Sequence, residues 1–297
     1  MEAWSLRRIL VLLVSALMAA ILAPTAFAQE DDSVVLRIGL TQDWETLNPT
    51  VGFAVSEYEI WNVHYATLTD KAAEDFAVVP GLAESWAESN DGLTYTYTLR
   101  EGLKWSDGEA LTADYVVFTY DYTAKFPALD FISIGAQLES VERVDERTVT
   151  FHLKEANSLI ATTIVGMPII PEHGWAEIED PVTFANENPV GSGPMTEITR
   201  FTPQVYEQCA NPHYWDADNL DVDCLRMPQL ADNPQVLAAL ADGTLDWATS
   251  FIPDIDNTFV AKDPEHHKYW FTPSSLVSFQ ISMVTPDENN RKAFNDV

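Results

Sequence analysis

The feature that most constrains the fold of this 297-residue chain is a stretch in which large apolar and threonine side chains alternate. Residues 93–99 (LTYTYTL) place leucine and tyrosine on one face and three threonines on the other. A period of two in residues of this kind predicts a strand with one buried face. Residues 90–92 (NDG) directly before it predict the turn that opens a hairpin.

Further segments alternate between strand and helix patterns. Strands are predicted over 33–40, and over 138–144 and 148–153, which a turn at Asp145-Glu146 joins into a second hairpin. A helix is predicted over 56–68, where Ser56 and Glu59 have the spacing of a capping box. Two other helices are predicted to begin at Thr112 and at Asn233. Strands interleaved with helices and hairpins indicate a mixed α/β protein.

The two cysteines, Cys209 and Cys224, fall on two further predicted strands, residues 202–209 and 222–227. If these strands flank residues 211–221 as a hairpin, the two thiols lie close together. An even count of cysteines in an exported chain favours a disulfide, and the alternative is two buried free thiols. Closing a loop of roughly 15 residues would stabilise the fold by about 3 kcal/mol.

The N-terminus has the layout of a secretory signal peptide, predicted over residues 1–28. Arg7 and Arg8 precede an apolar run over residues 9–23, and Ala26-Phe27-Ala28 supplies a small-x-small cleavage pattern. The run is shorter than the ~20 residues that span a bilayer as a helix. The alternative is an uncleaved membrane anchor. Cleavage would place the protein outside the cytoplasm, on the periplasmic or extracellular side of the cell envelope.

The charge balance is strongly acidic. Removing residues 1–28 would leave 14 basic and 45 acidic side chains, a net charge of −31. Such a surface repels nucleic acid and anionic lipid, because phosphate binding requires clustered lysine and arginine. A nucleic-acid partner is therefore not expected.

No segment carries a specific catalytic or metal-binding pattern, so neither a cofactor nor a metal is expected. Residues 191–193 (GSG) are closest to a nucleophile turn but are interpreted as a structural turn. His266-His267 are neighbours that diverge on any regular element and are interpreted as a surface pair. The acidic residues of 216–223 lack the spacing of a calcium loop and are interpreted as a solvated hairpin tip.

An aromatic group follows the first predicted strand. Phe53, Tyr58 and Trp61 lie in or just after the loop that leaves this strand. Ligands of open α/β sheets bind where loops leave the carboxyl ends of strands, and aromatic faces there stack on sugars, peptide side chains or cations. The alternative is that all three belong to the core, and Trp61 is the one most expected to be buried.

Several motifs, in order, resemble the extracellular solute-binding proteins of family 5, the oligopeptide, dipeptide and nickel type of ABC importer. Residues 80–86 (PGLAESW) and 89–95 (SNDGLTY) are followed by 99–108 (LREGLKWSDG) and 111–118 (LTADYVVF). Residues 188–194 (NPVGSGP), 211–215 (NPHYW) and 238–246 (AALADGTLD) continue the resemblance. One departure is Met195, where the family usually has tyrosine. The similarity extends from about residue 34 to the end.

The resemblance implies an α/β, periplasmic-binding-protein-like fold of two lobes, with an extra α+β domain inserted in the first lobe and the second lobe truncated. It implies a discontinuous first lobe (33–52 and 182–268), an inserted domain (53–181) and the start of the second lobe (269–297). Because family members are far longer, the chain is expected to be an N-terminal fragment. Ligand contacts are expected at Phe53, Ala54 and Val55, together with Tyr58, and at Val277 and Phe279.

By this resemblance the expected function is that of an extracytoplasmic solute-binding component, which captures a peptide and delivers it to an ABC transporter permease in the membrane. The alternatives are an oligosaccharide ligand, a nickel complex and, from a different class, a secreted hydrolase or an adhesion module. The absence of a catalytic motif argues against an enzyme, and the absence of repeats argues against an adhesion module. The protein is expected to be a monomer.

Overall fold

In the computed structural model, the residues described are 33–44, 46–52, 55–72, 75, 77–157, 166–249 and 252–269. The chain divides into two compact units, residues 1–250 and 251–297. The predicted signal peptide lies outside the described residues. Within the described part of the chain, no helix has the length and apolar character needed to cross a membrane.

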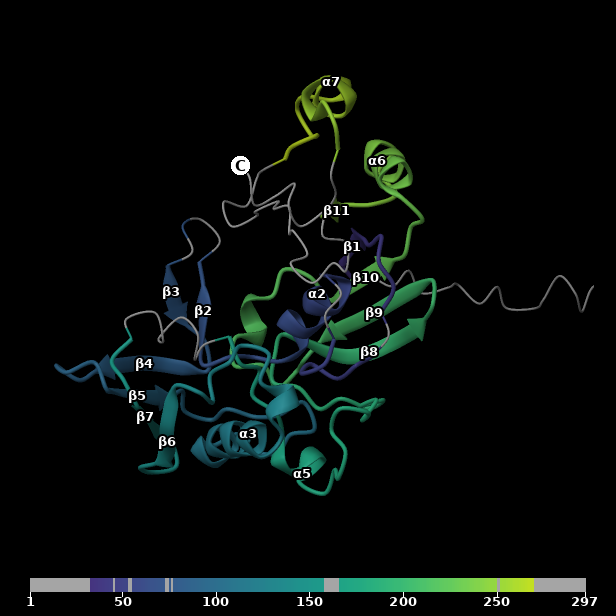
Figure 1. The fold of residues 1–297 in the computed structure, drawn as a ribbon. Helices are drawn as coiled ribbons and strands as arrows, with labels where there is room; N and C mark the ends of the chain where they lie inside the picture. The colour runs from purple at the N-terminus through teal and green to yellow at the C-terminus, as the bar shows by residue number, and fades with distance from the viewer. Residues whose placement is uncertain are drawn as a thin grey trace, which may run out of the picture. The chain divides into compact units, whose positions relative to one another are not determined.

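The larger sheet of the first unit has five strands in the order β11-β1-β10-β9-β8 (Figure 1). Its strands are β1 (Val35–Gly39), β8 (Met195–Thr202), β9 (Val205–Ala210), β10 (Cys224–Pro228) and β11 (Trp247–Ala248). β1 is parallel to both β10 and β11, whereas β9 is antiparallel to β10 and to β8. Segments nearly 190 residues apart therefore meet in the centre of this sheet.

Helix α2 (Val55–His64) packs against one face of the larger sheet. Its Ile60 and Trp61, with Tyr65 just beyond its end, are buried together with sheet residues such as Tyr206 and Met227. Helix α6 (Asn233–Ala241) forms the crossover between the parallel strands β10 and β11. It is followed by Gly243, whose φ of +75° suits a residue without a β-carbon at a helix end.

The smaller sheet has four antiparallel strands in the order β4-β5-β7-β6. They are β4 (Ala83–Glu88), β5 (Thr94–Leu99), β6 (Leu138–Arg143) and β7 (Thr148–Leu153). Helix α3 (Ala113–Lys125) packs on this sheet (Figure 1). Tyr95, Tyr97 and Phe151 are buried between them, and the rings of Tyr97 and Phe151 meet edge to face at 5.5 Å.

Short elements complete the description. In the first unit these are β2 (Thr69–Lys71), β3 (Val78–Pro80), α5 (Glu172–Trp175), and the 3₁₀ turns η1 (Pro127–Leu129) and η2 (Ala217–Asn219). The second unit contains α7 (Ile255–Thr258) and the 3₁₀ turn η3 (Val260–Lys262). There the His267 ring stacks on Phe259 at 4.1 Å.

The predicted α/β class is confirmed, and so are the three strands predicted in the smaller sheet, β5, β6 and β7. β5 and β7 fall inside the predicted segments, and Gly92 in the preceding turn has a φ of +70°. In β5 the leucine and tyrosine side chains are buried and the threonines are half-buried, as the alternation predicts.

Three local predictions were wrong. The predicted strand 202–209 spans a turn, because β8 ends at Thr202 and β9 begins at Val205. The predicted capping box does not form, because Ser56 lies inside α2 and its hydroxyl donates to the Asp43 carbonyl oxygen. The N-cap of α6 is Asp232, since its carboxylate accepts from the Gln235 amide at 3.0 Å, one residue before the predicted Asn233.

Candidate ligand-binding site

The parallel strands of the larger sheet end along one edge, which is where ligands bind in open α/β sheets. The chain leaves β1 after Gly39, β10 after Pro228 and β11 after Ala248. Just beyond, Leu40 pairs with Gln229. We call residues 40–44, 46–52, 55–59, 229–232 and 249 the carboxyl edge. Its loops and the beginning of α2 form the candidate site.

Hydrogen bonds fix the start of α2 to this edge. The Thr46 amide donates to Oε1 of Glu57 at 3.2 Å. On another side of the helix, the Thr249 hydroxyl donates to Oε1 of Glu59 at 2.9 Å, across 190 residues of sequence. The side-chain amide of Gln229 donates to the Asp43 carboxylate. The loop after β1 therefore contacts Glu57 of α2, the loop after β10 contacts Asp43 in the loop after β1, and Thr249 after β11 contacts Glu59 of α2.

Glu59 is the most electrostatically perturbed group of the carboxyl edge. Burial raises its pKa, since a low-dielectric surrounding disfavours the ionised carboxylate, whereas the hydrogen bond from Thr249 acts in the opposite direction. Its second oxygen, Oε2, is buried and has no hydrogen-bond partner among the described residues.

The predicted ligand residues are only partly covered by the described structure. Tyr58 lies on α2 and is 37% exposed. Val55 begins α2, and its side chain is outside the description. Phe53 and Ala54, like Val277 and Phe279, lie outside the described residues. The burial predicted for Trp61 is confirmed, because it is 2% exposed.

The glycine-rich segment 188–194 serves a structural purpose. A β-carbon on Gly191 would lie 2.2 Å from the His64 carbonyl oxygen, and one on Gly193 would lie 2.5 Å from that of Val63. Only glycine therefore fits against the end of α2. Ser192 is 2% exposed and its hydroxyl accepts from the Ala66 amide at 3.3 Å, which supports the interpretation of this segment as a turn.

His64, at the end of α2, is held by the same segment. Its Nε2 lies 3.3 Å from the Pro189 carbonyl oxygen, and its own carbonyl oxygen accepts from the Gly193 amide at 2.9 Å. The side chain is fully buried, and burial lowers the pKa of His64 to about 4. At neutral pH the imidazole is therefore uncharged and acts as part of the packing.

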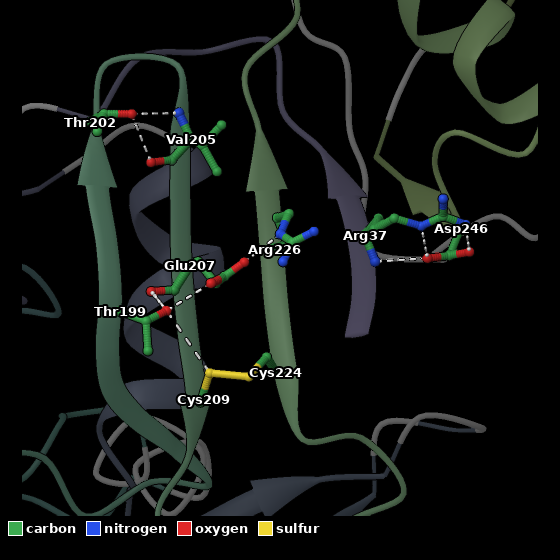
Figure 2. Close-up of polar contacts among 9 residues, drawn as sticks. All are labelled: Arg37, Thr199, Thr202, Val205, Glu207, Cys209, Cys224, Arg226 and Asp246. Atoms are coloured by element: carbon green, nitrogen blue, oxygen red, sulfur yellow. Dashed lines mark hydrogen bonds and ion pairs between the residues drawn. A yellow bond between two sulfur atoms is a disulfide. The ribbon is translucent and has the colours of Figure 1, made fainter. Parts of the chain in front are cut away.

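The predicted disulfide is confirmed. Cys209 on β9 and Cys224 on β10 are directly opposite one another and are bonded (Figure 2). The neighbouring pair on the same two strands is an ion pair between Glu207 and Arg226, and Arg37 on β1 forms a two-bond ion pair with Asp246. Figure 2 shows these contacts side by side on the larger sheet.

No metal site is apparent. Among the residues that the structure describes, no group of three or more histidine, cysteine or acidic side chains could hold an ion. Nδ1 of His266 donates to the Asp263 carboxylate at 2.9 Å, and Nδ1 of His267 donates to the Phe259 carbonyl oxygen instead. Of the acidic residues in 216–223, Asp223 accepts from the Val34 amide at 2.6 Å and so anchors the start of β1.

Residues from several of the recognised motifs form contacts between loops next to the smaller sheet and loops next to the larger sheet. The Arg100 guanidinium lies 3.6 Å over the Trp215 ring, and its Nε donates to the Gly81 carbonyl oxygen at 2.7 Å. Close by in sequence, the Ser106 amide donates to the Gly191 carbonyl oxygen at 2.8 Å. We call these five residues the joint. They connect loops that adjoin the two sheets.

A surface hollow of about 410 Å³ lies elsewhere in the first unit. It is bordered by α5 and the segment that precedes β8, with lining residues Pro171, Gly174, Trp175, Phe184, Ala185, Asn186, Glu187, Asn188 and Val190. None of these residues belongs to the carboxyl edge. The hollow nevertheless adjoins the candidate site, because the side-chain amide of Asn186 donates to the Leu47 carbonyl oxygen at 2.9 Å and that of Asn48 donates to the Phe184 carbonyl oxygen at 3.0 Å.

Comparison with known proteins identifies the class. Residues 77–297 match the bacterial extracellular solute-binding proteins, family 5 (middle region). Protein XP55 of Streptomyces lividans is 32% identical over 274 residues, which are 89% of this chain and 48% of that protein. The chain belongs to the family 5 extracellular solute-binding proteins, whose members are binding proteins.

Solved structures agree with this assignment. The periplasmic oligopeptide-binding protein of a Thermotoga maritima ABC transporter, solved with mannohexaose bound, is 28% identical with a TM-score of 0.67; the match covers 78% of this chain and 44% of that one. AppA of Bacillus subtilis, an oligopeptide-binding protein solved with a nonapeptide, is 25% identical with a TM-score of 0.63, covering 75% and 45%. The chain spans about half the length of these relatives or less.

Proposed function

We propose that this protein is the extracytoplasmic solute-binding component of an ABC importer, and that it captures a peptide and delivers it to the membrane permease. The observation that carries the proposal is the carboxyl edge, where the loops leaving three parallel strands converge beside an exposed tyrosine. Membership of family 5 supports the same role. Binding would rest on enclosure of the ligand and hydrogen bonds, with no covalent step.

The domain division implied by the sequence belongs to this proposal. The first lobe would comprise residues 33–52 and 182–268, the inserted domain 53–181, and the second lobe would start at 269. In this division the larger sheet would belong to the first lobe and the smaller sheet to the inserted domain. Export, a monomeric state and the absence of enzymatic activity are further parts of the proposal. They are supported by the signal-like N-terminus, by the family and by the lack of a catalytic motif.

An oligosaccharide is the second candidate ligand. It is favoured by one specific observation, the mannohexaose bound to the similar Thermotoga maritima protein. Tyr58 offers an aromatic face at the carboxyl edge that could stack on a sugar ring as well as on a peptide side chain.

A thermal-shift screen of the complete protein against mixed tripeptides and pentapeptides, manno- and xylo-oligosaccharides, and nickel would test the proposal. A ligand that binds only the native state at one hundred times its Kd stabilises it by about 2.7 kcal/mol, which raises Tm by several degrees. Peptide-dependent shifts are expected. Shifts with sugars alone would favour the second candidate, whereas release of cleavage products from the same panel would favour a hydrolase. No shift with any compound would contradict the proposal.

A further inference from the structure

The hollow beside α5 has the size and the apolar lining of a small-molecule site. Its volume of about 410 Å³ falls in the range of about 300–1,000 Å³ that such sites occupy in proteins. Phe184 and Val190 line it and are half-buried. The buried Trp175 ring supports Phe184 from behind, edge to face at 5.1 Å. These side chains offer an apolar wall to a ligand.

Asn186 is the buried polar residue of the hollow, 5% exposed. Its Nδ2 donates to the Leu47 carbonyl oxygen at 2.9 Å and to the Tyr65 hydroxyl at 2.8 Å, which occupies both of its hydrogens. A carbonyl oxygen only accepts, so these contacts also fix which end of the amide is nitrogen. The amide oxygen, Oδ1, accepts no hydrogen bond from any described residue, and it is not sealed inside the fold. Asn186 therefore presents a free acceptor to the hollow.

The surrounding backbone holds Asn186 in place. Its φ of +52° lies in the left-handed region, which asparagine tolerates better than most residues with a side chain. The fully buried Asn48 braces the preceding segment, because its Nδ2 donates to the carbonyl oxygens of Pro181 and Phe184 at 2.8 and 3.0 Å. The acceptor is thus preorganised, and a ligand that donates to it does not have to order it first.

The charge of the hollow favours a cation. Among the described residues that line it, Glu187 carries the one charge, and it follows Asn186 directly in the sequence. The whole stretch between Lys154 and Arg200, which supplies every lining residue, contains neither lysine nor arginine. A positive charge in the hollow is attracted to the Glu187 carboxylate, whereas an anion is repelled by it.

We infer that the hollow is a second binding site, and that it takes small organic ammonium ions with an apolar body. The ammonium donates to Oδ1 of Asn186 and is attracted by Glu187, while the apolar body packs against Phe184 and Val190. The site shares no residue with the carboxyl edge, so the inference does not depend on the proposed function.

The test is a titration of the complete protein at neutral pH with three probes of similar shape, followed by ligand-observed NMR. Phenethylamine is a cation that donates, 2-phenylethanol is a neutral donor, and 3-phenylpropionate is an anion without a donor. A Kd on the order of 1 mM is expected for phenethylamine, given its size. The alcohol is expected to bind about tenfold more weakly, because hydrogen bonds between charged groups are stronger, and the anion should not bind.

Two variants separate the contributions of acceptor and charge. Glu187→Gln removes the charge, so it should weaken phenethylamine binding about fivefold or more and leave 2-phenylethanol unaffected. Asn186→Gly removes Oδ1 and suits the left-handed backbone, so it should weaken both probes. Glu139→Gln, at an exposed position of β6, is the control for charge and should change neither affinity.

A third variant locates the site without touching either polar residue. Ala185 lines the hollow and is exposed, so Ala185→Phe should fill the hollow and abolish binding of both probes. Ala238→Phe, at an exposed position of α6, adds the same side chain elsewhere and should leave binding unchanged. The melting temperature of each variant verifies that it is folded, and Ala185→Phe and Glu187→Gln decide the test if Asn186→Gly does not fold.

The outcomes are distinct. If phenethylamine does not bind, or if Ala185→Phe keeps full affinity, the hollow is not the site and the inference is wrong. If the alcohol or the anion binds as tightly as the ammonium, the assigned class of ligand is wrong. Phenethylamine that is displaced by a peptide and still binds Ala185→Phe would lie at the carboxyl edge, which also overturns the inference. None of these results bears on peptide binding, which the thermal-shift screen tests separately.

Discussion

Acid should destabilise this fold through His64, and the size of the effect can be worked out from its environment. An unfolded chain titrates histidine near pH 6.5, whereas burial lowers the pKa of His64 to about 4 in the folded state. Between these values the unfolded state binds more protons, so the stability contribution is complete above pH 6.5 and is lost as the pH falls toward 4. One pH unit is worth 1.36 kcal/mol per group, so the loss amounts to about 3 kcal/mol.

The appropriate assay is urea unfolding followed by tryptophan fluorescence at several pH values between 7.5 and 4. Protonation of paired carboxylates also lowers the free energy of unfolding in acid. Asp246 is one example, because the hydrogen bond from Arg37 lowers the pKa of this carboxylate. The decisive quantity is therefore the difference between the unaltered protein and His64→Gln, which keeps a polar side chain of similar size and cannot be protonated.

The expected result is a difference in unfolding free energy that changes by about 3 kcal/mol across this pH range. His266→Gln is the control, since the His266 side chain is 73% exposed and solvent screens its contact with Asp263, so its removal should change the pH dependence far less than His64→Gln does. Parallel curves for the unaltered protein and His64→Gln would refute the argument, because they would mean that His64 is not neutral and buried in the folded state.

Two further predictions concern the frame of the larger sheet. Gly191→Ala should lower the free energy of unfolding by about 3 kcal/mol or prevent folding, because the new methyl group would lie 2.2 Å from a backbone oxygen. Gly174→Ala is the control: the nearest atom to its new methyl group would be 3.6 Å away, so the free energy of unfolding should change by less than about 1 kcal/mol. Urea melts of both variants test this, and equal effects would contradict the clash. Replacing Cys209 and Cys224 together with alanine should lower stability by about 3 kcal/mol, and reduction of the unaltered protein should match that loss. A melting temperature unaffected by either treatment would refute the disulfide's role.

How well the sequence predicted each element depended on how local its determining contacts are. β5 could be predicted because threonine alternates with leucine and tyrosine, and this alternation places the apolar side chains on one buried face within six residues. β8 was missed, since most of its side chains are exposed and no period of two stands out. The hairpin around Pro203 therefore merged with β9 into a single predicted strand. The disulfide could be predicted because the two cysteines lie at the two ends of one connection, 15 residues apart in the sequence.

The candidate site was less predictable for the same reason. Sequence reasoning found the loop after β1 and the aromatic Tyr58, but treated Glu59 as part of a helix cap. Its actual partner, Thr249, is 190 residues away and follows a strand of only two residues. The one local signal was the absence of lysine and arginine on both stretches that form the carboxyl edge, which becomes meaningful only when the parallel register brings them together.

The joint between the two sheets has a consequence for how ligand choice can change in such a protein. Arg100 and Trp215 identify the chain by its motifs, yet they hold the architecture and do not belong to the carboxyl edge. If the proposed function holds, the residues of the joint and the residues that would contact the ligand are therefore separate sets. On that proposal, substitutions at the carboxyl edge would change the choice of ligand and leave the joint unaltered, so two proteins with identical joints could bind chemically different solutes.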